Sequence, residues 1–307
     1  MALRIASRFL LILAFTALPG CGEDPAPTAS ATDVSVVATT TQVADFVRHV
    51  GGERVAVSQI LEPNSEPHNY EPRPSDAIDV SRAAVVFRSG GDLDAWLGDL
   101  LDSAGGEAKV IELIGAVRVR GDDPHWWQDP RNAVLAVEEV RDRLIEADPR
   151  GRRTYEGNAA AYVARLRGLD RAVAACVEKV PPARRSVVTT HDALGYYADR
   201  YGLRVIGALI PSLSTQAQPS SGDTQDLVEQ IERLSVKAIF PESSVDPELE
   251  DAVARETGAE VGEALWADTL GPDGSSGATY VQSIEANTAA LVDGLTGGKV
   301  SCPVLER

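Results

Sequence analysis

Three of the four histidines in this 307-residue chain lie where predicted strands end. His68 stands in a proline-rich loop after the strand expected at 54–60, and His125 follows the strand expected at 109–113. His191 directly follows the first strand predicted in the second half of the chain. Ligands of open parallel sheets bind outside the carboxyl ends of the strands, so these three imidazoles could meet in one place. Imidazole nitrogen is a ligand suited to zinc and its neighbouring transition metals.

Two carboxylates also follow predicted strands of the second half. Asp268 comes after the strand expected at 260–265, and as a fourth ligand it would complete a four-coordinate site. Glu242 comes after the strand expected at 237–240. Glu242 could hold a ligand histidine through the second ring nitrogen, or it could simply cap a helix or lie in a loop. The pattern therefore predicts a transition-metal site with three histidines, with Asp268 as the fourth ligand.

The loop around His68 is stiffened by proline. Residues 61–76 contain four prolines, and each restricts its own backbone and that of the residue before it. A loop that is already ordered loses less freedom when its histidine binds a ligand. The alternative is an ordinary surface loop whose histidine only titrates. The fourth histidine, His49, lies inside a predicted helix and receives no role.

Strand and helix patterns alternate with short connections, which predicts an α/β fold. We expect two lobes, each a mostly parallel β-sheet flanked by helices, at 33–150 and 181–307. Residues 151–180 predict one long backbone helix that joins the lobes and could act as a rigid spine. Two shorter helices are expected to begin at a Ser75 cap and to span 93–101.

The N-terminus has the pattern of an export signal. Residues 1–20 combine two arginines with an apolar core too short to span a membrane, and they end directly before Cys21. Residues before Cys21 resemble a bacterial lipobox, which implies cleavage there and a lipid on the sulfur of Cys21. An ordinary secretory peptide with an incidental cysteine is the alternative. The small, polar residues of the segment 21–32 predict a flexible tether.

Charge and cysteine content narrow the possible partners. The formal net charge of −17 argues against nucleic acid and against broad adhesion to anionic lipid. If Cys21 carries lipid, Cys176 and Cys302 remain in an oxidising compartment, where a disulfide between them is the natural expectation. Two buried free thiols are the alternative.

Four sequence motifs together resemble the zinc/manganese solute-binding proteins of ABC transporters, the cluster A-I family of metal-binding lipoproteins. The resemblance covers nearly the whole chain after the tether, with the motifs in the family's order. The motifs are Glu-Pro-His-Asn-Tyr-Glu-Pro-Arg-Pro-Ser-Asp, Asp-Pro-His-Trp-Trp-Gln-Asp-Pro, Thr-Thr-His-Asp-Ala-Leu-Gly-Tyr-Tyr-Ala and Ile-Phe-Pro-Glu-Ser-Ser.

The resemblance implies one metal ion in a cleft between two lobes, with His68, His125, His191 and Asp268 as its ligands. It implies a binding protein, not an enzyme, that delivers Zn²⁺, or alternatively Mn²⁺, to a permease and its ATPase. We further expect a monomer, anchored outside the cytoplasm through lipid on Cys21. Many zinc members carry a histidine-rich acidic loop before the second ligand. The short span here has no histidine, and it leaves Asp122 and Asp123 as at most a remnant of such a loop.

Three other functions compete with this interpretation. A secreted zinc-dependent hydrolase would need an open coordination position, whereas four protein ligands would fill the site. No His-Glu-x-x-His motif stands in the sequence. A binding protein for a siderophore or haem would need a larger pocket with a basic or aromatic lining. An adhesin role could coexist with metal binding.

Overall fold

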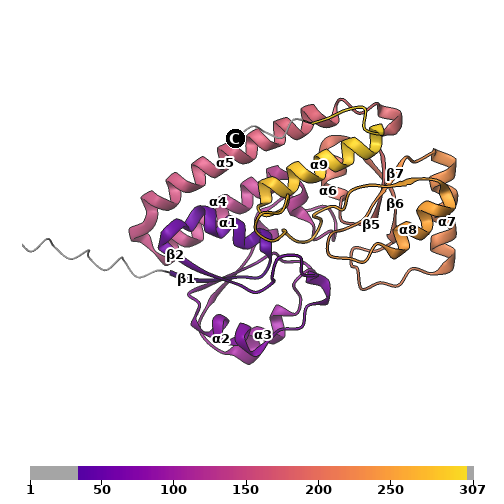
Figure 1. Cartoon of the computed structure of the whole chain (residues 1–307). Coiled ribbons are helices and arrows are strands. Elements are labelled where there is room, and N and C mark those ends of the chain that lie inside the picture. Colours follow the sequence, from indigo (N-terminus) through magenta and orange to yellow (C-terminus); the bar gives the residue numbers. More distant parts are fainter. Residues whose placement is uncertain (1–33, 303–307) are drawn as a thin grey trace, which may run out of the picture. The chain divides into compact units, whose positions relative to one another are not determined.

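Two parallel four-stranded sheets frame the protein, one from each half of the chain (Figure 1). The computed structural model describes residues 34–302. The predicted signal peptide at 1–20, Cys21 and the tether at 21–32 therefore lie outside the described residues. No helix within residues 34–302 has the length and apolar character needed to cross a membrane.

Both sheets have the same strand order. The first sheet runs β2-β1-β3-β4 and the second runs β6-β5-β7-β8, and all neighbouring strands are parallel. The predicted fold class is confirmed. The strands are β1 (Val34–Ala38), β2 (Val55–Gln59), β3 (Val85–Arg88), β4 (Lys109–Glu112), β5 (Ser186–His191), β6 (Arg204–Ile210), β7 (Ala238–Phe240) and β8 (Glu260–Val261).

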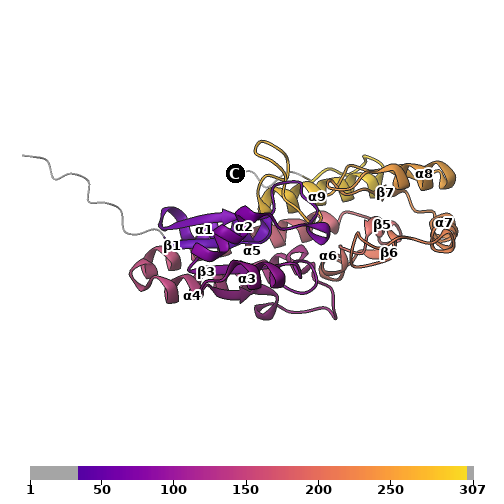
Figure 2. The same cartoon turned by 90° about the horizontal axis from the view of Figure 1, so that it is seen from below.

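Helices cover both faces of each sheet (Figures 1 and 2). They are α1 (Thr41–Gly51), α2 (Pro74–Arg82), α3 (Leu97–Ala104), α4 (Pro130–Ala147), α5 (Arg152–Val177), α6 (Gly195–Tyr201), α7 (Ser221–Leu234), α8 (Glu248–Thr257) and α9 (Tyr280–Thr296).

The two-residue period of each strand divides its side chains between two helical layers. In β1, Val36 and Ala38 pack with α1, α4 and α5, whereas Val37 packs with α2 and α3. In the second sheet, Val188 of β5 packs with α7 and α8, and Phe240 of β7 faces α9 and the larger cluster. That larger cluster contains residues from both sheets, so one apolar core extends across the two halves of the chain.

The long helix α5 has 26 residues and is therefore roughly 39 Å long at 1.5 Å per residue. It ends at Val177, slightly before the predicted limit of 180, and α9 runs beside it (Figure 1). A disulfide joins Cys176 of α5 to Cys302, with 5.7 Å between their Cα atoms. This bond ties the end of the described chain to α5.

Three predicted boundaries are wrong. Helix α2 starts at Pro74 with Arg73 as its N-cap, because proline already has the backbone angle of the first helical position, so Ser75 is not the cap. Helix α3 begins at Leu97 instead of 93, because the Asp94 carboxylate accepts hydrogen bonds from Ser89 and Arg88 and holds the preceding residues in a turn.

The third wrong boundary concerns the segment before Asp268. Strand β8 covers only two residues, Glu260–Val261, where the sequence predicts a strand through 265. An added Cβ on Gly262 would lie 2.7 Å from the Phe240 ring, so the backbone passes close to that ring just after β8. Pairing returns only as an isolated bridge between Leu265 and Glu242. A loop, not a strand end, therefore carries Asp268.

Candidate metal centre

His68 lies on a short 3₁₀ turn, Pro67–Asn69, that several contacts hold in place. The Glu66 carboxylate accepts a hydrogen bond from the His68 backbone N–H at 3.1 Å. The indole of Trp96 donates to the carbonyl of Pro67, and the side-chain amide of Gln216 donates to the carbonyl of His68. Gln216 belongs to the polar stretch before α7, so that stretch meets the proline loop directly.

His125 is fully buried, and Asp123 sets the orientation of its ring. One oxygen of Asp123 accepts from the His125 backbone N–H at 3.0 Å and from Nδ1 at 2.8 Å. The other oxygen accepts from the guanidinium of Arg120 at 3.3 Å. The sequence interpretation treated Asp123 as at most a loop remnant and missed this contact with His125. A usable signal was present, because Glu66-Pro-His68 and Asp123-Pro-His125 share the pattern acidic-Pro-His.

His191 ends β5 and is fully buried. Glu242 accepts from its backbone N–H at 3.1 Å and from its Nδ1 at 2.7 Å. Glu242 thus contacts His191 as Asp123 contacts His125. An ionised carboxylate can only accept hydrogen bonds, so in both pairs Nδ1 carries the proton. Each ring is left with a bare Nε2 when the imidazole is neutral.

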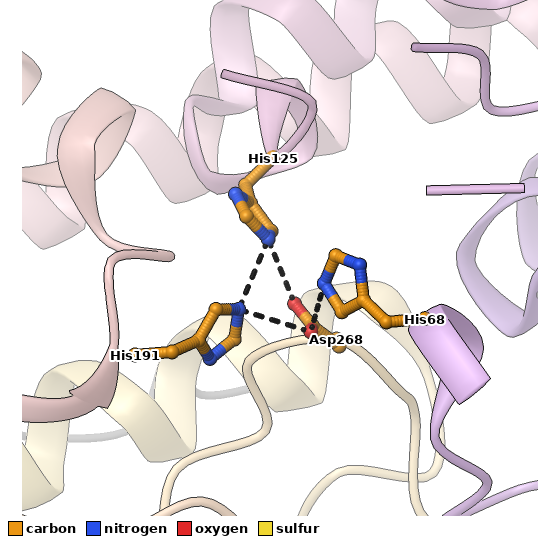
Figure 3. Close-up of side chains that lie close together, drawn as sticks. All are labelled: His68, His125, His191 and Asp268. Carbon is orange, nitrogen blue, oxygen red and sulfur yellow. Dashed lines mark hydrogen bonds and ion pairs between the residues drawn. The ribbon is translucent and has the colours of Figure 1, made fainter. Parts of the chain in front are cut away.

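Four side chains converge on one point (Figure 3). His68 Nε2 lies 3.2 Å from Asp268 Oδ2, and His191 Nε2 lies 3.3 Å from the same oxygen. His125 Nε2 lies 3.4 Å from Asp268 Oδ1 and 3.2 Å from His191 Nε2. Corners of a tetrahedron with bonds of about 2.0–2.1 Å are roughly 3.3 Å apart. The spacing of these donor atoms therefore suits a small four-coordinate cation.

Several of these donor atoms have no hydrogen-bond partner among the described residues. Both carboxylate oxygens of Asp268 and Nε2 of His68 are buried and make no hydrogen bond, although they lie within ion-pair distance. Buried polar atoms without partners are costly and rare in folded proteins. Their convergence here fits a bound cation, which would satisfy all of them at once.

The carboxylates and imidazoles of the centre shift one another's pKa values. Burial opposes ionisation of Asp268, yet His191 and His125 hold the pKa of that carboxyl well below its usual range. Burial also opposes protonation of His191, yet Glu242 and Asp268 raise its pKa well above the ordinary value. Burial and the Asp268 charge raise the pKa of Glu66. A proton on His191 must leave before its Nε2 can bind a cation.

A cleft of about 450 Å³ lies beside the centre, and among the four converging residues only His68 lines it. Asp92 and Asp122 contribute carboxylates to the cleft, and Gln216 lines it from the second half of the chain. The ring of Trp127 lies edge-on to His125, with 5.5 Å between the ring centroids. Trp127 thus borders the centre.

Comparison with known proteins places this arrangement in a family. The family model described as "Zinc-uptake complex component A periplasmic" matches residues 36–294. The manganese-binding lipoprotein MntA of Halalkalibacterium halodurans is 29% identical over 300 residues, covering 95% of this chain and 99% of the relative. The metal ABC transporter substrate-binding lipoprotein SsaB of Streptococcus sanguinis is 28% identical, covering 93% and 97%.

Solved structures agree with the sequence relatives. The periplasmic zinc-binding protein TroA of Treponema pallidum superposes with a TM-score of 0.81 at 27% identity, covering 86% of this chain and 99% of TroA. These relatives are substrate-binding proteins and not enzymes, so the alternative of a zinc hydrolase has no support. The chain belongs to the family of periplasmic zinc-uptake components, the metal-binding substrate-binding proteins of ABC transporters.

Proposed function

We propose that this protein captures Zn²⁺ outside the cytoplasm and delivers it to an ABC permease and its ATPase. The observation that carries the proposal is the set of donor atoms from His68, His125, His191 and Asp268, which all lie within 4.8 Å of one another. The imidazole nitrogens lie 3.2 to 3.4 Å from the Asp268 carboxylate, and those of His125 and His191 lie 3.2 Å apart. We assign these four residues as the ligands. Three imidazoles and one carboxylate form a donor set that zinc accepts readily.

Asp123 and Glu242 complete the proposed centre. By accepting from Nδ1 of His125 and His191, they keep both Nε2 atoms directed at the ion. Carboxylates in this position also make the imidazole a stronger donor. The protein therefore offers an ion two rings that are already oriented, which lowers the ordering cost of binding.

Mn²⁺ is the competing cargo. The named relatives include a manganese-binding lipoprotein and a zinc-binding protein, so relatedness alone does not choose between the two ions. The donor set favours zinc, because manganese prefers more oxygen ligands and lies below zinc in the general order of affinities.

The remaining features suit a tethered carrier. We propose that residues 1–20 direct export and that Cys21 then carries the lipid, with 21–32 as the tether to the membrane. We also propose that the lobes at 33–150 and 181–307 act as the two walls of the cleft, joined by the helix at 151–180. A single chain supplies all four proposed ligands, so a monomer suffices for capture.

The ligand assignment is tested by titrating zinc into the His68→Ala variant in competition with a chromophoric chelator. His49→Ala is the matched control, because it removes an imidazole that lies outside the centre. We expect the affinity to fall at least 100-fold in His68→Ala and to stay unchanged in His49→Ala. Undiminished affinity in His68→Ala would overturn the assignment. Elemental analysis of protein purified without added metal, followed by competition with Mn²⁺, identifies the preferred ion.

A further inference from the structure

The loop that carries Asp268 is held by residues from the first half of the chain. The carbonyl of Ala267, one residue before Asp268, accepts from the indole Nε1 of Trp127 at 2.9 Å. The same carbonyl accepts from the side-chain amide of Gln128 at 2.8 Å. Trp127 and Gln128 are almost completely buried, so water does not compete for these bonds.

The residues after Asp268 are held in the same way. The backbone N–H of Leu270 donates to the Thr41 hydroxyl at 2.8 Å. The backbone N–H of Asn64 is shared between the Leu270 carbonyl and the Thr269 hydroxyl, each at 2.9 Å. Thr41, Thr269 and Leu270 are all buried. Asp268 is thus bracketed by hydrogen bonds to the first half of the chain.

The hydrogen bonds that hold the loop of Asp268 change from the second half of the chain to the first between Trp266 and Ala267. Trp266 is still bound to the second half, since both its N–H and its carbonyl pair with the side chain of Asn287 in α9. From Ala267 onward, the hydrogen bonds described above run to the first half. Because the Asp268 carboxylate itself has no hydrogen-bond partner among the described residues, the backbone of its loop decides where it points.

The holding residues are close in sequence to two of the proposed ligands. Trp127 and Gln128 stand two and three residues after His125, and Asn64 stands four residues before His68. We propose that Thr41, Asn64, Trp127 and Gln128 are positioning residues that fix Asp268 relative to His68 and His125.

His191 is then the one ligand held by the second sheet alone. A shift of that sheet would change the distances to His191 and leave the other three ligands together. This inference rests on the ligand assignment proposed above.

A double-mutant cycle tests the proposal. Thr41→Val keeps the shape of the side chain but removes the hydroxyl oxygen that accepts from the Leu270 N–H. The separate variant Thr41→Ser keeps that hydroxyl. We expect Thr41→Val to weaken zinc binding about 10- to 100-fold and Thr41→Ser to bind nearly as the parent. In an Asp268→Ala background, Thr41→Val should cause no further loss, because its effect passes through Asp268.

Cobalt spectra give a second readout that a purely structural role would not change. The Co²⁺-loaded Thr41→Val variant should show altered ligand-field bands while its circular dichroism matches the parent. If Thr41→Val does not fold, Trp127→Phe enters the same cycle, since it removes the donor to Ala267 and keeps an aromatic ring.

The possible failures are distinguishable. Equal losses from Thr41→Val in the parent and Asp268→Ala backgrounds, or no loss in the parent, would overturn the positioning role alone. Parent-like zinc affinity in Asp268→Ala itself would overturn the ligand assignment, and the positioning role with it.

Discussion

Replacing Asp123 by Asn tests whether this carboxylate prepares His125 for metal. The substitution keeps the side-chain shape and removes the negative charge. The new amide has two orientations in the site. If its NH₂ group faces Nδ1, the imidazole must move its proton to Nε2, where the proton blocks the ion. If its oxygen faces Nδ1, its NH₂ group opposes the guanidinium of Arg120, and both groups are donors.

The expected loss can be worked from the contacts. Asp123 is 2% exposed, and its bond to Nδ1 is 2.8 Å long, so this is a buried, charge-assisted hydrogen bond. Hydrogen bonds to charged groups contribute about 1.5–3 kcal/mol. At about 1.4 kcal/mol per tenfold change, the zinc affinity of Asp123→Asn should fall by about 10- to 100-fold.

The assay is competition for Zn²⁺ against a chromophoric chelator at fixed pH and salt. Asp99→Asn is the matched control, because it makes the same charge change at an exposed position of α3 that lines neither the centre nor the cleft. We expect the control to bind zinc like the parent. Equal affinities of Asp123→Asn and the parent, or equal losses in both variants, would refute the role assigned to Asp123.

Three further predictions concern pH and stability. Burial opposes protonation of His191, but the carboxylates around it raise its pKa, so on acidification the loss of zinc affinity should already begin at a pH above 6.5. Calorimetry in buffers of different ionisation enthalpy should detect a proton released on zinc binding at pH 7, and the absence of that proton would contradict this reasoning. Cys302→Ser opens a loop with a sequence separation of 126 residues, so denaturant unfolding should show a loss of up to about 5 kcal/mol, whereas an unchanged midpoint would argue against the bond. Burial opposes protonation of His49, but Asp45 raises its pKa; its stabilising contribution should be complete below about pH 6.5 and disappear as the pH rises through the raised value. Unfolding curves of the parent and His49→Gln from about pH 5.5 to 8.5 should therefore converge, and parallel curves would exclude this coupling.

Local patterns were sufficient to predict most of the framework. Thr40 caps α1 through its side chain, and Gly52 follows the end of that helix, and both are residue types that favour helix ends. Asp129 and Pro130 likewise mark the start of α4. These signals act over a few residues, so the sequence displays them directly. Ser75 and Asp94 show the limit, because other contacts of the fold override a plausible capping residue or helix start.

The positions of the histidines could also be anticipated, since strand ends of parallel sheets gather at one edge. Asp268 was predicted as a ligand because it was expected to follow the end of a strand, and that expectation was wrong. Its loop follows a strand of only two residues, and contacts from distant residues determine its path. The role of Asp123 was missed, although the repeated acidic-Pro-His pattern could have indicated it.

The α/β class, the family and the residue types able to bind a transition metal can be inferred from the order of residues alone, because periodicity and short motifs encode these features locally. The folded chain is needed to bring four donor atoms within 4.8 Å of one another and to set Asp123 and Glu242 against two of the rings. Folding also places hydrogen-bonding residues of the first half of the chain around the loop that carries Asp268. These facts depend on contacts between residues as far apart as Thr41 and Leu270, and such contacts exist only once the whole core has packed.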